Sequence, residues 1–215
     1  MRKLVAADCV PVGHRPLLEA TVDYAAKVER IASESLTPRM VALTKLAIAL
    51  SISNREMVLH CLHEAKELAS ETDIGDAVFV ASGMKAGAAT AYGRLVFKYL
   101  DPGDIVVDGQ IQSDRALMTQ LRTASPAAFV AWQQRVGMSV RLALSDKEYE
   151  LICIACATVS QCVYCLEYHG GQARKAGVSD REVADAVHLV ISMRAMAEFV
   201  EWQASTMPLA SRPDG

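Results

Sequence analysis

The chain has 215 residues, of which 52% are hydrophobic, 22% charged and 6% aromatic, and its formal net charge is −3 at pH 7. A chain of this length can bury a sizeable core as one domain or as two small ones. The weak negative charge gives no reason to expect a nucleic acid or an anionic membrane as a partner. No apolar run reaches the roughly 18 residues that span a bilayer, and the N-terminus meets Asp8 before any long apolar segment. We therefore expect a cytoplasmic protein.

The first part of the chain predicts a series of helices. Residues 1–14 have no periodicity, and we expect them to form a mobile arm. Apolar residues then recur at helical spacing, and N-capping residues precede several of these segments. The expected elements are a helix at 15–32, a nearly all-apolar helix at 40–50 after the cap Thr37-Pro38, a helix at 55–69, and a further helix that starts at the capping box Ser70-Glu71-Thr72-Asp73.

The second part of the chain repeats this pattern. It follows residues 99–120, which we interpret as a linker because they show little periodicity. The expected elements are a helix after Ser125-Pro126, a nearly all-apolar helix at 150–159 after the capping box Ser145-Asp146-Lys147-Glu148, a helix that ends at Gly177, and a helix from residue 183 onwards after the capping box Ser179-Asp180-Arg181-Glu182.

A shift of 108 residues aligns the two parts of the sequence. The matched pairs are Thr37 with Ser145, Ala42 with Glu150, Leu43 with Leu151, Asn54 with Cys162, Met57 with Cys165, and Cys61 with His169. Such self-similarity predicts an all-α fold of two tandem helical repeats, each about 60 residues long at its core. We expect the first repeat at 15–98 and the second at 121–207, with the polar site only in the second.

The segment from Ser160 to His169 carries the clearest chemical pattern. Cys162 and Cys165 are three positions apart and His169 follows four positions later, so the three side chains share one face of a helix. We expect Ser160 to cap this helix, which leaves Cys162 in the first turn, where unpaired backbone N–H groups favour a thiolate. The spacing predicts a dithiol/disulfide redox site.

Cys153 and Cys156 form a second Cys-x-x-Cys pair, upstream of the first. Four cysteines between Cys153 and Cys165 are also compatible with a zinc or iron–sulfur site. Both residues, however, lie inside the apolar stretch 151–157, and four thiolates around one metal would require that helix to unwind. We therefore expect core packing for Cys153 and Cys156, and no bound metal.

The polar residues around the first pair resemble those of a known family. Glu150-Leu151-Ile152 is followed after nine residues by Cys162-Val163-Tyr164-Cys165, then by His169 and by Lys175-Ala176-Gly177. This pattern resembles the alkylhydroperoxidase D / carboxymuconolactone decarboxylase-like family. The resemblance implies an all-α fold of paired repeats and a homo-oligomer, with a trimer favoured over a dimer or a hexamer. It also implies a thiol-based hydroperoxide reductase.

The resemblance implies a role for each residue of the site. In that family the glutamate and the histidine relay a proton that activates the second cysteine. These roles carry over to Glu150, His169 and Cys165, with Cys162 as the resolving partner. An adjacent base matters because an unperturbed thiol is mostly protonated at neutral pH.

Three further positions bear on substrate binding. Tyr164 stands where the peroxidase has a second histidine, and its hydroxyl is a candidate hydrogen-bond donor to a substrate. His188 is a further candidate, with a core histidine as the alternative. Gly170-Gly171 directly follows the site inside a helix, where each glycine costs about 1 kcal/mol relative to alanine. The pair indicates either a tight helix contact or space left for a substrate.

Three functions are compatible with these residues. The main hypothesis is a hydroperoxide reductase without a bound cofactor, whose Cys162/Cys165 pair is regenerated by an external dithiol, lipoyl or thioredoxin-like. The second is a lyase or isomerase of the carboxymuconolactone decarboxylase type, in which His169 and Glu150 act on a cyclic acid. The third is a non-catalytic helical oligomer in which the dithiol is a redox sensor or a stabilising clip. Because the lyase needs no thiols, the Cys-x-x-Cys pair favours the first.

Overall fold

The computed structural model describes residues 4–100, 106–107, 110–111, 114–135 and 141–206. Within these ranges the chain is helical, apart from one antiparallel pair of two-residue strands. The elements are α1 (Arg15–Ala32), α2 (Pro38–Ile52), α3 (Arg55–Leu68), α4 (Glu71–Gly93), α5 (Phe97–Leu100), β1 (Val106–Val107), β2 (Gln110–Ile111), α6 (Asp114–Ala124), α7 (Pro126–Arg135), α8 (Asp146–Val159), α9 (Val163–Lys175) and α10 (Asp180–Thr206). The predicted all-α fold class is confirmed.

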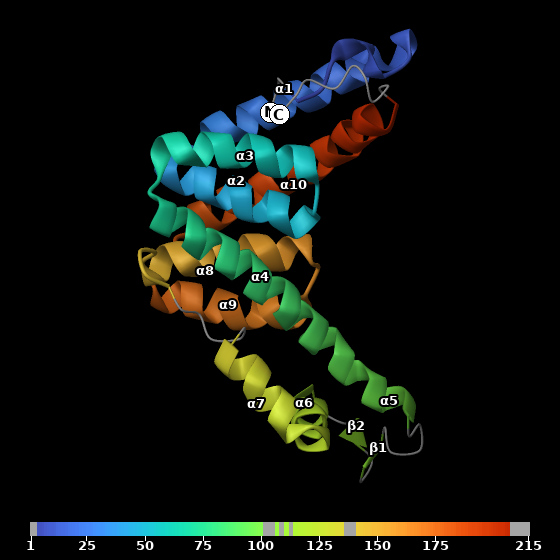
Figure 1. Ribbon diagram of the computed structural model, residues 1–215, viewed down its shortest axis with the longest axis vertical. Coiled ribbons are helices and arrows are strands. Elements are labelled where there is room, and N and C mark those ends of the chain that lie inside the picture. Colours follow the sequence, from blue (N-terminus) through green and yellow to red (C-terminus); the bar gives the residue numbers. More distant parts are fainter. Residues whose placement is uncertain (1–3, 101–105, 108–109, 112–113, 136–140, 207–215) are drawn as a thin grey trace.

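Two helices, α2 and α8, form the centre of the bundle. α2 packs against α3, α4 and α8, while α8 packs against α4, α9 and α10. In Figure 1, α1 and α10 lie together at one end of the long axis, and α4 crosses α8 and α9 on its way to α5. α6, α7 and the strand pair lie at the opposite end of the long axis, beyond α9. The long helix α4 therefore connects the bundle with the smaller group of helices.

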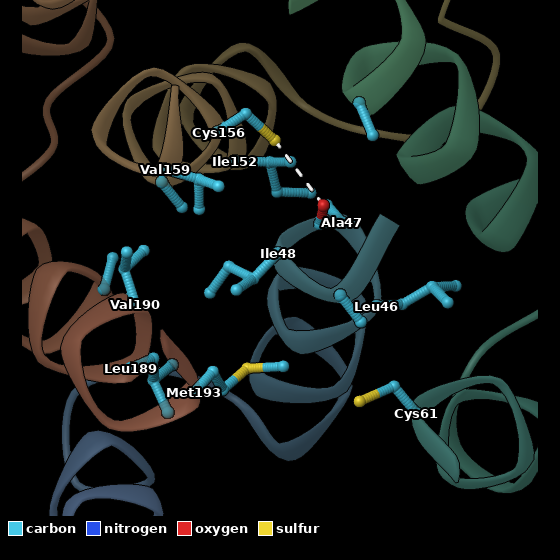
Figure 2. Close-up of a cluster of buried hydrophobic side chains, with 14 of the residues drawn as sticks. Leu46, Ala47, Ile48, Cys61, Ile152, Cys156, Val159, Leu189, Val190 and Met193 are labelled. Carbon is cyan, nitrogen blue, oxygen red and sulfur yellow. Dashed lines mark hydrogen bonds between the residues drawn. The ribbon is translucent and has the colours of Figure 1, made fainter. Parts of the chain in front are cut away.

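α2 and α8 are apolar on all sides, as is typical of helices enclosed by other helices. All residues at 40–49 in α2 and at 150–157 in α8 are buried. Figure 2 shows where the two helices meet: the Sγ atom of Cys156 lies 3.9 Å from the carbonyl oxygen of Ala47. Small side chains at this contact let the helix axes approach. Among the described residues, even so, no helix combines the length and the apolar character that crossing a membrane requires.

The N-caps predicted at Thr37, Ser70, Ser145 and Ser179 are confirmed. Thr37 Oγ1 accepts the Met40 N–H at 3.2 Å, and Pro38 is the first residue of α2. Gly177 follows α9 with φ 77°, a left-handed conformation that glycine adopts without strain. Reciprocal capping boxes are formed by Ser70 with Asp73, by Ser145 with Glu148, and by Ser179 with Glu182.

The N-terminal residues differ from the expectation of a mobile arm. Val5 and Val10 are buried as part of the core. The Ala6 N–H donates to Gln203 Oε1 at 2.6 Å, and the Trp202 indole N–H donates to the carbonyl oxygen of Cys9 at 2.8 Å. The expectation is therefore wrong for residues 4–10, which pack against α10. Their sequence lacks a helical period because the buried Val5 and Val10 lie on either side of a short 3-10 turn, Ala7–Cys9, which buries no residue itself.

The expected linker at 99–120 also contains defined structure. It holds the β1–β2 pair, with Val106 opposite Ile111, and the first part of α6. α6 is anchored by Leu117, whose side chain is fully buried. The linker interpretation follows from the Asp-Pro-Gly-Asp stretch at 101–104, whereas α6, which begins further on, has a clear amphipathic pattern. The predicted start of the second repeat at residue 121 falls within α6, and its end at 207 lies just outside the described residues.

Ion pairs recur at matching positions of the two predicted repeats. Arg39, at the start of α2, pairs with Asp73 of α4. Lys147, at the start of α8, pairs with Glu182 of α10 at 2.8 Å. In each case the acid is also the last residue of a capping box, so one carboxylate both closes a helix N-terminus and binds the neighbouring helix.

A second set of contacts joins the two halves to each other. Asp76 of α4 accepts the backbone N–H groups of residues 142–144, which precede α8, at 2.8–3.1 Å. Asp185 of α10 accepts the hydroxyl of Ser35, which precedes α2, at 2.6 Å. The last helix of each half thus fixes the segment that leads into the other half. These matching contacts support the duplication, which is itself still a prediction from the sequence.

The first half contains a buried ion cluster at the position that aligns with Cys153. Lys45 is only 2% exposed, and its Nζ atom lies 2.6 Å from a carboxylate oxygen of Glu29 and 2.6 Å from one of Glu64. Burial alone lowers the pKa of Lys45, but the two carboxylates outweigh burial, so the pKa is raised. Burial raises the pKa of Glu64, and hydrogen bonds from His60 and Lys45 outweigh it, which brings the pKa to about 2.

We predict that this cluster makes the fold sensitive to acid. The pKa of Glu64 drops from 4.5 to about 2 on folding, so its stabilisation is complete above pH 4.5 and is lost as the pH falls through about 2. Urea unfolding between pH 7 and pH 2 measures this loss. Glu64→Gln should lower the free energy of unfolding at pH 7 and flatten its decline with falling pH. Glu67→Gln, an exposed acid of the same helix, is the control, and equal pH profiles for the two variants would contradict the prediction.

Candidate active site

The turn between α8 and α9 carries the two cysteines of the predicted redox site. Gln161 has φ 53°, a left-handed conformation that redirects the chain after α8. Cys162 is then the N-cap of α9, and its Sγ atom accepts the N–H of Cys165 at 3.2 Å. The two cysteines form a disulfide, with their Cα atoms 5.2 Å apart. The expectation that Ser160 caps this helix is wrong, because Gln161 separates Ser160, which ends α8, from the start of α9.

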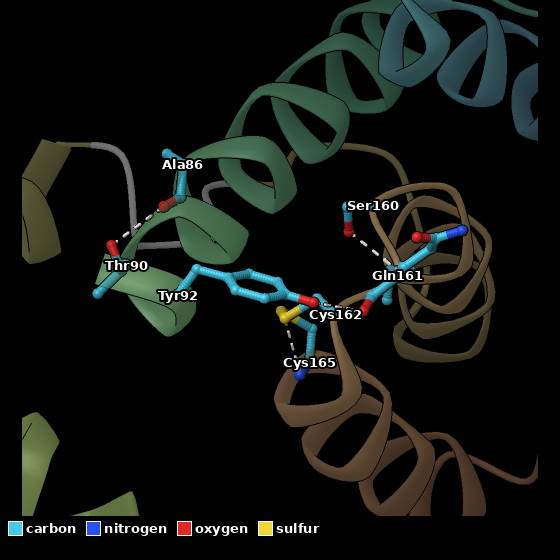
Figure 3. Close-up of a disulfide and its surroundings, with 8 residues drawn as sticks. Ala86, Thr90, Tyr92, Ser160, Gln161, Cys162 and Cys165 are labelled. Atoms are coloured by element: carbon cyan, nitrogen blue, oxygen red, sulfur yellow. Dashed lines mark hydrogen bonds between the residues drawn. A yellow bond between two sulfur atoms is a disulfide. The ribbon is translucent and has the colours of Figure 1, made fainter. Parts of the chain in front are cut away.

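A tyrosine of α4 forms a hydrogen bond with this turn. The Tyr92 hydroxyl donates to the carbonyl oxygen of Gln161 at 3.1 Å. Figure 3 shows the Tyr92 ring extending from α4 to the turn, beside the disulfide. The contact joins residues that are 69 positions apart, so nothing in the local sequence signals it. It holds the left-handed residue that sets the direction of α9.

The predicted acid and base meet next to the disulfide. The Nδ1 atom of His169 on α9 lies 2.8 Å from the Oε2 atom of Glu150 on α8. Glu150 is 8% exposed, and the rings of Tyr149 and Tyr168 face the imidazole edge-on. When Nδ1 donates its proton to the carboxylate, Nε2 is the atom of the ring that can accept another. The pair is thus a base with a fixed tautomer.

A cavity of about 690 Å³ opens beside these residues. Its wall includes Glu150, His169 and Cys165, whereas Cys162 does not line it. Of the two sulfurs, Cys165 is therefore the one that a molecule in the cavity can reach. The rest of the wall combines polar groups with apolar and aromatic side chains, among them Phe79, Met84, Met118, Phe129, Trp132, Tyr149, Tyr164 and Tyr168.

Two polar residues of the cavity wall were not singled out from the sequence. Arg141 lies with its guanidinium 4.6 Å from the centre of the Tyr149 ring and forms an ion pair with Asp146. The indole nitrogen of Trp132 is buried and has no hydrogen-bond partner in the described part of the chain. Arg141 can bind an anion, and Trp132 can donate a hydrogen bond. No local sequence pattern predicts that either residue lines the cavity, because the tertiary fold alone brings them there.

The predicted substrate-binding residues have different outcomes. Tyr164 lines the cavity, and the guanidinium of Arg94 lies 4.8 Å from its ring centre. His188 does not line the cavity: it lies on α10, and its Nδ1 atom is 3.2 Å from the Tyr24 hydroxyl of α1. The structure therefore does not bring His188 to the site. The alternative of a tight helix contact at Gly170-Gly171 is wrong, since a side chain there would meet no atom within 4 Å.

Cys153 and Cys156 are both buried in α8, as expected for core residues. Burial raises the pKa of Cys156 to about 11, although the nearby Ser51 hydroxyl acts in the other direction. Burial also raises the pKa of Cys153 well above its ordinary value, with Cys156 adding to the shift and a hydrogen bond with Tyr149 opposing it. Both thiols are therefore protonated at neutral pH, and neither is an activated nucleophile.

Fold and site together define a class of protein: an all-α protein in which a dithiol at a helix N-terminus adjoins a glutamate–histidine pair. Residues 126–204, which contain that site, match the model of the carboxymuconolactone decarboxylase family. This match agrees with the family resemblance seen in the sequence of the second half.

Two individual proteins are similar to this chain. An uncharacterised protein from the cox locus of Paracoccus denitrificans is 35% identical over 57 residues, which are 26% of this chain and 51% of that protein. The match thus spans about half the length of this relative. A crystal structure from Burkholderia xenovorans, provisionally described as a gamma-carboxymuconolactone decarboxylase subunit, aligns with a TM-score of 0.67 at 15% identity. The alignment covers 88% of this chain and 84% of the chain in that crystal structure. The second comparison shows a shared fold.

We predict that Asp76 is needed to hold the segment that places Arg141. Asp76→Ala removes the acceptor of the backbone N–H groups of residues 142–144, which should lower the free energy of unfolding by about 2–4 kcal/mol. Denaturant unfolding measures the change. Glu71→Ala, an exposed acid of the same helix, should stay within about 0.5 kcal/mol of the parent protein. Similar losses in both variants would show that the anchored segment does not depend on Asp76.

Proposed function

We propose that the protein is a thiol-dependent oxidoreductase that reduces organic hydroperoxides through Cys165 and Cys162. The observation that carries the proposal is the cavity, whose wall holds Cys165 together with the hydrogen-bonded pair Glu150–His169. A nucleophile, a base and a group that orients the base thus adjoin one space of about 690 Å³. The match of residues 126–204 to the family model is compatible with this activity and does not by itself establish it.

The reaction begins with the reduced dithiol. His169 takes the proton of the Cys165 thiol through Nε2, and Glu150 stabilises the resulting imidazolium. The thiolate attacks the terminal oxygen of the hydroperoxide, so that an S–O bond forms and the O–O bond breaks. The alkoxide leaves with the proton from His169 as an alcohol, and Cys165 becomes a sulfenic acid.

The second half-reaction restores the disulfide. The Cys162 thiol attacks the sulfenic sulfur of Cys165, the S–S bond forms, and the hydroxyl group leaves as water. One hydroperoxide has then been reduced to an alcohol and water, and two thiols have been oxidised to one disulfide. An external dithiol, lipoyl or thioredoxin-like, returns both cysteines to the thiol state by disulfide exchange.

The start of α9 favours this chemistry. Cys165 is the third residue of the helix, and its N–H already points at the Cys162 sulfur. The positive end of the helix dipole stabilises a thiolate in the first turn. Trp132 offers its unpartnered indole N–H from the cavity wall as a donor to the leaving oxygen. The aromatic wall favours a hydroperoxide with an apolar body.

The assembly and the location are part of the proposal. Phe79, Leu142, Val163 and Tyr168 are exposed apolar side chains of the helices around the cavity and of the adjoining segment. Apolar side chains grouped in this way support a homo-oligomer, for which we favour a trimer over a dimer or a hexamer. A reducing cytoplasm is the compartment in which a dithiol partner can keep the Cys162/Cys165 pair active.

A second candidate function is a lyase or isomerase acting on a cyclic acid. The observation in its favour is Arg141, which lines the cavity near Glu150 and can bind a carboxylate. His169 and Glu150 would then perform acid–base chemistry, and the thiols would take no part. The third candidate, a redox sensor without turnover, draws only on the disulfide itself.

We predict that Cys165→Ser abolishes hydroperoxide consumption measured with a dithiol reductant. His169→Ala should lower kcat/KM by about 10²- to 10⁴-fold, the usual contribution of a general base. Cys156→Ser is the control, because that thiol is buried in the preceding helix α8 and does not line the cavity. Its turnover should match that of the parent protein. Hydroperoxide consumption by Cys165→Ser at the parental rate would refute the reductase.

The same variants separate the alternatives. A lyase would keep its activity on a cyclic acid in the double variant Cys162→Ser, Cys165→Ser and lose it in His169→Ala. A sensor would show no turnover in any form, but its thermal midpoint or oligomeric state would change when the disulfide forms.

A further inference from the structure

A third thiol lies against the acid–base pair of the site. Cys153 is three residues after Glu150 on α8, so the two side chains share the face of the helix that is turned towards His169. One ligand atom from each of Glu150, Cys153 and His169 can be chosen so that all of them lie within 4.8 Å of one another. Cys153 is fully buried and Glu150 nearly so, which means that these groups face each other and not bulk solvent.

The three groups offer sulfur, nitrogen and oxygen ligands, which is the donor range that zinc uses in proteins. Tetrahedral coordination with bonds of roughly 2.0–2.3 Å places ligand atoms roughly 3.3–3.8 Å apart. Donor atoms already within 4.8 Å of one another reach that geometry by small side-chain adjustments. Glu150 and His169 also line the cavity, so a fourth coordination position would face the cavity, open to water or to a ligand.

We propose that Glu150, Cys153 and His169 form a binding site for a zinc ion with one open position. Binding exchanges the proton of the Cys153 thiol for a zinc–sulfur bond, and no change of oxidation state is involved. The soft thiolate selects zinc or cobalt over magnesium or calcium, which prefer oxygen ligands alone. Cys162 and Cys165 take no part while they are joined as a disulfide.

Zinc at this position would control the site. The ion would occupy the carboxylate of Glu150 and the imidazole of His169, the groups that move the proton in the proposed reduction. Bound zinc would therefore block turnover until a chelator removes it. This consequence rests on the proposed reductase function, whereas the metal site itself does not.

The chain supplies a matched control for the thiol. Cys156 is also buried in α8, three residues after Cys153, but its Sγ atom lies 3.9 Å from the carbonyl oxygen of Ala47 on α2. It is not part of the three-residue cluster. Cys153→Ser and Cys156→Ser therefore remove the same atom from the same helix, and only the first removes a proposed ligand.

The test uses oxidised protein, so that the disulfide cannot bind metal. Zinc affinity is measured by competition with a chromophoric chelator, and cobalt is added separately to look for thiolate-to-metal charge-transfer absorption. The parent protein and Cys156→Ser should bind one zinc ion with equal affinity and show the absorption. Cys153→Ser should bind zinc at least about tenfold more weakly and lack the absorption. Thermal melts of both variants establish that they are folded.

A second variant covers the case in which Cys153→Ser does not fold. His169→Gln removes a ligand from the cavity wall, where the fold depends on it less, and should also lose at least about tenfold in zinc affinity. Zinc affinity in Cys153→Ser or His169→Gln equal to that of the parent would overturn the proposal, as would an equal loss in Cys156→Ser. If the protein binds zinc but shows no hydroperoxide turnover after a chelator has removed the metal, the metal site stands and the reductase is refuted. Turnover without zinc binding would do the reverse.

Discussion

The structure depends on the burial of residues 150–157 of α8. This part of the helix is enclosed by α2, α4, α9 and α10, so each of its side chains must find a partner inside the protein. Most are apolar or small, and the contact of Cys156 with the backbone of Ala47 shows how closely α2 approaches. Glu150 is the exception. A buried carboxylate is costly unless it is paired, and His169 provides the pairing from α9. The chemistry of the site thus follows from the packing of the core.

The two halves solve the same packing problem with different residues. Where the second half has Cys153 and His169, the 108-residue shift places Lys45 and Cys61 in the first. Lys45 is buried between Glu29 and Glu64, so the first half is not simply apolar where it lacks the residues of the candidate site. Each half has a buried polar group on its central helix, Lys45 on α2 and Glu150 on α8. Lys45 is neutralised by two carboxylates, whereas Glu150 adjoins a cavity.

The sequence predicted the features that are local and missed those that depend on distant contacts. Helix N-termini were predicted well because capping residues act within one turn, as at Ser145 and Glu148. Cys162, Cys165 and His169 were recognised because their spacing places them on one face of a helix, and Glu150 was added through the family resemblance. Arg141, Trp132 and Tyr92 were missed because they come from segments whose approach to the site is set by tertiary packing. His188 lies away from the cavity, since an apolar helix pattern does not say which neighbour a polar side chain faces.

Each half contributes an aspartate that binds the other half, and this has a consequence for the predicted duplication. Asp76 binds the segment that leads into the second half, and Asp185 binds the segment that leads into the first. Each half therefore holds part of the other in place, as the two subunits of a symmetric dimer do. The first half, which lacks the candidate site residues, is therefore still needed, because the segment that leads into the second half depends on Asp76. Under the predicted duplication, the first half would be a permanent scaffold whose interior could change as long as that carboxylate stayed.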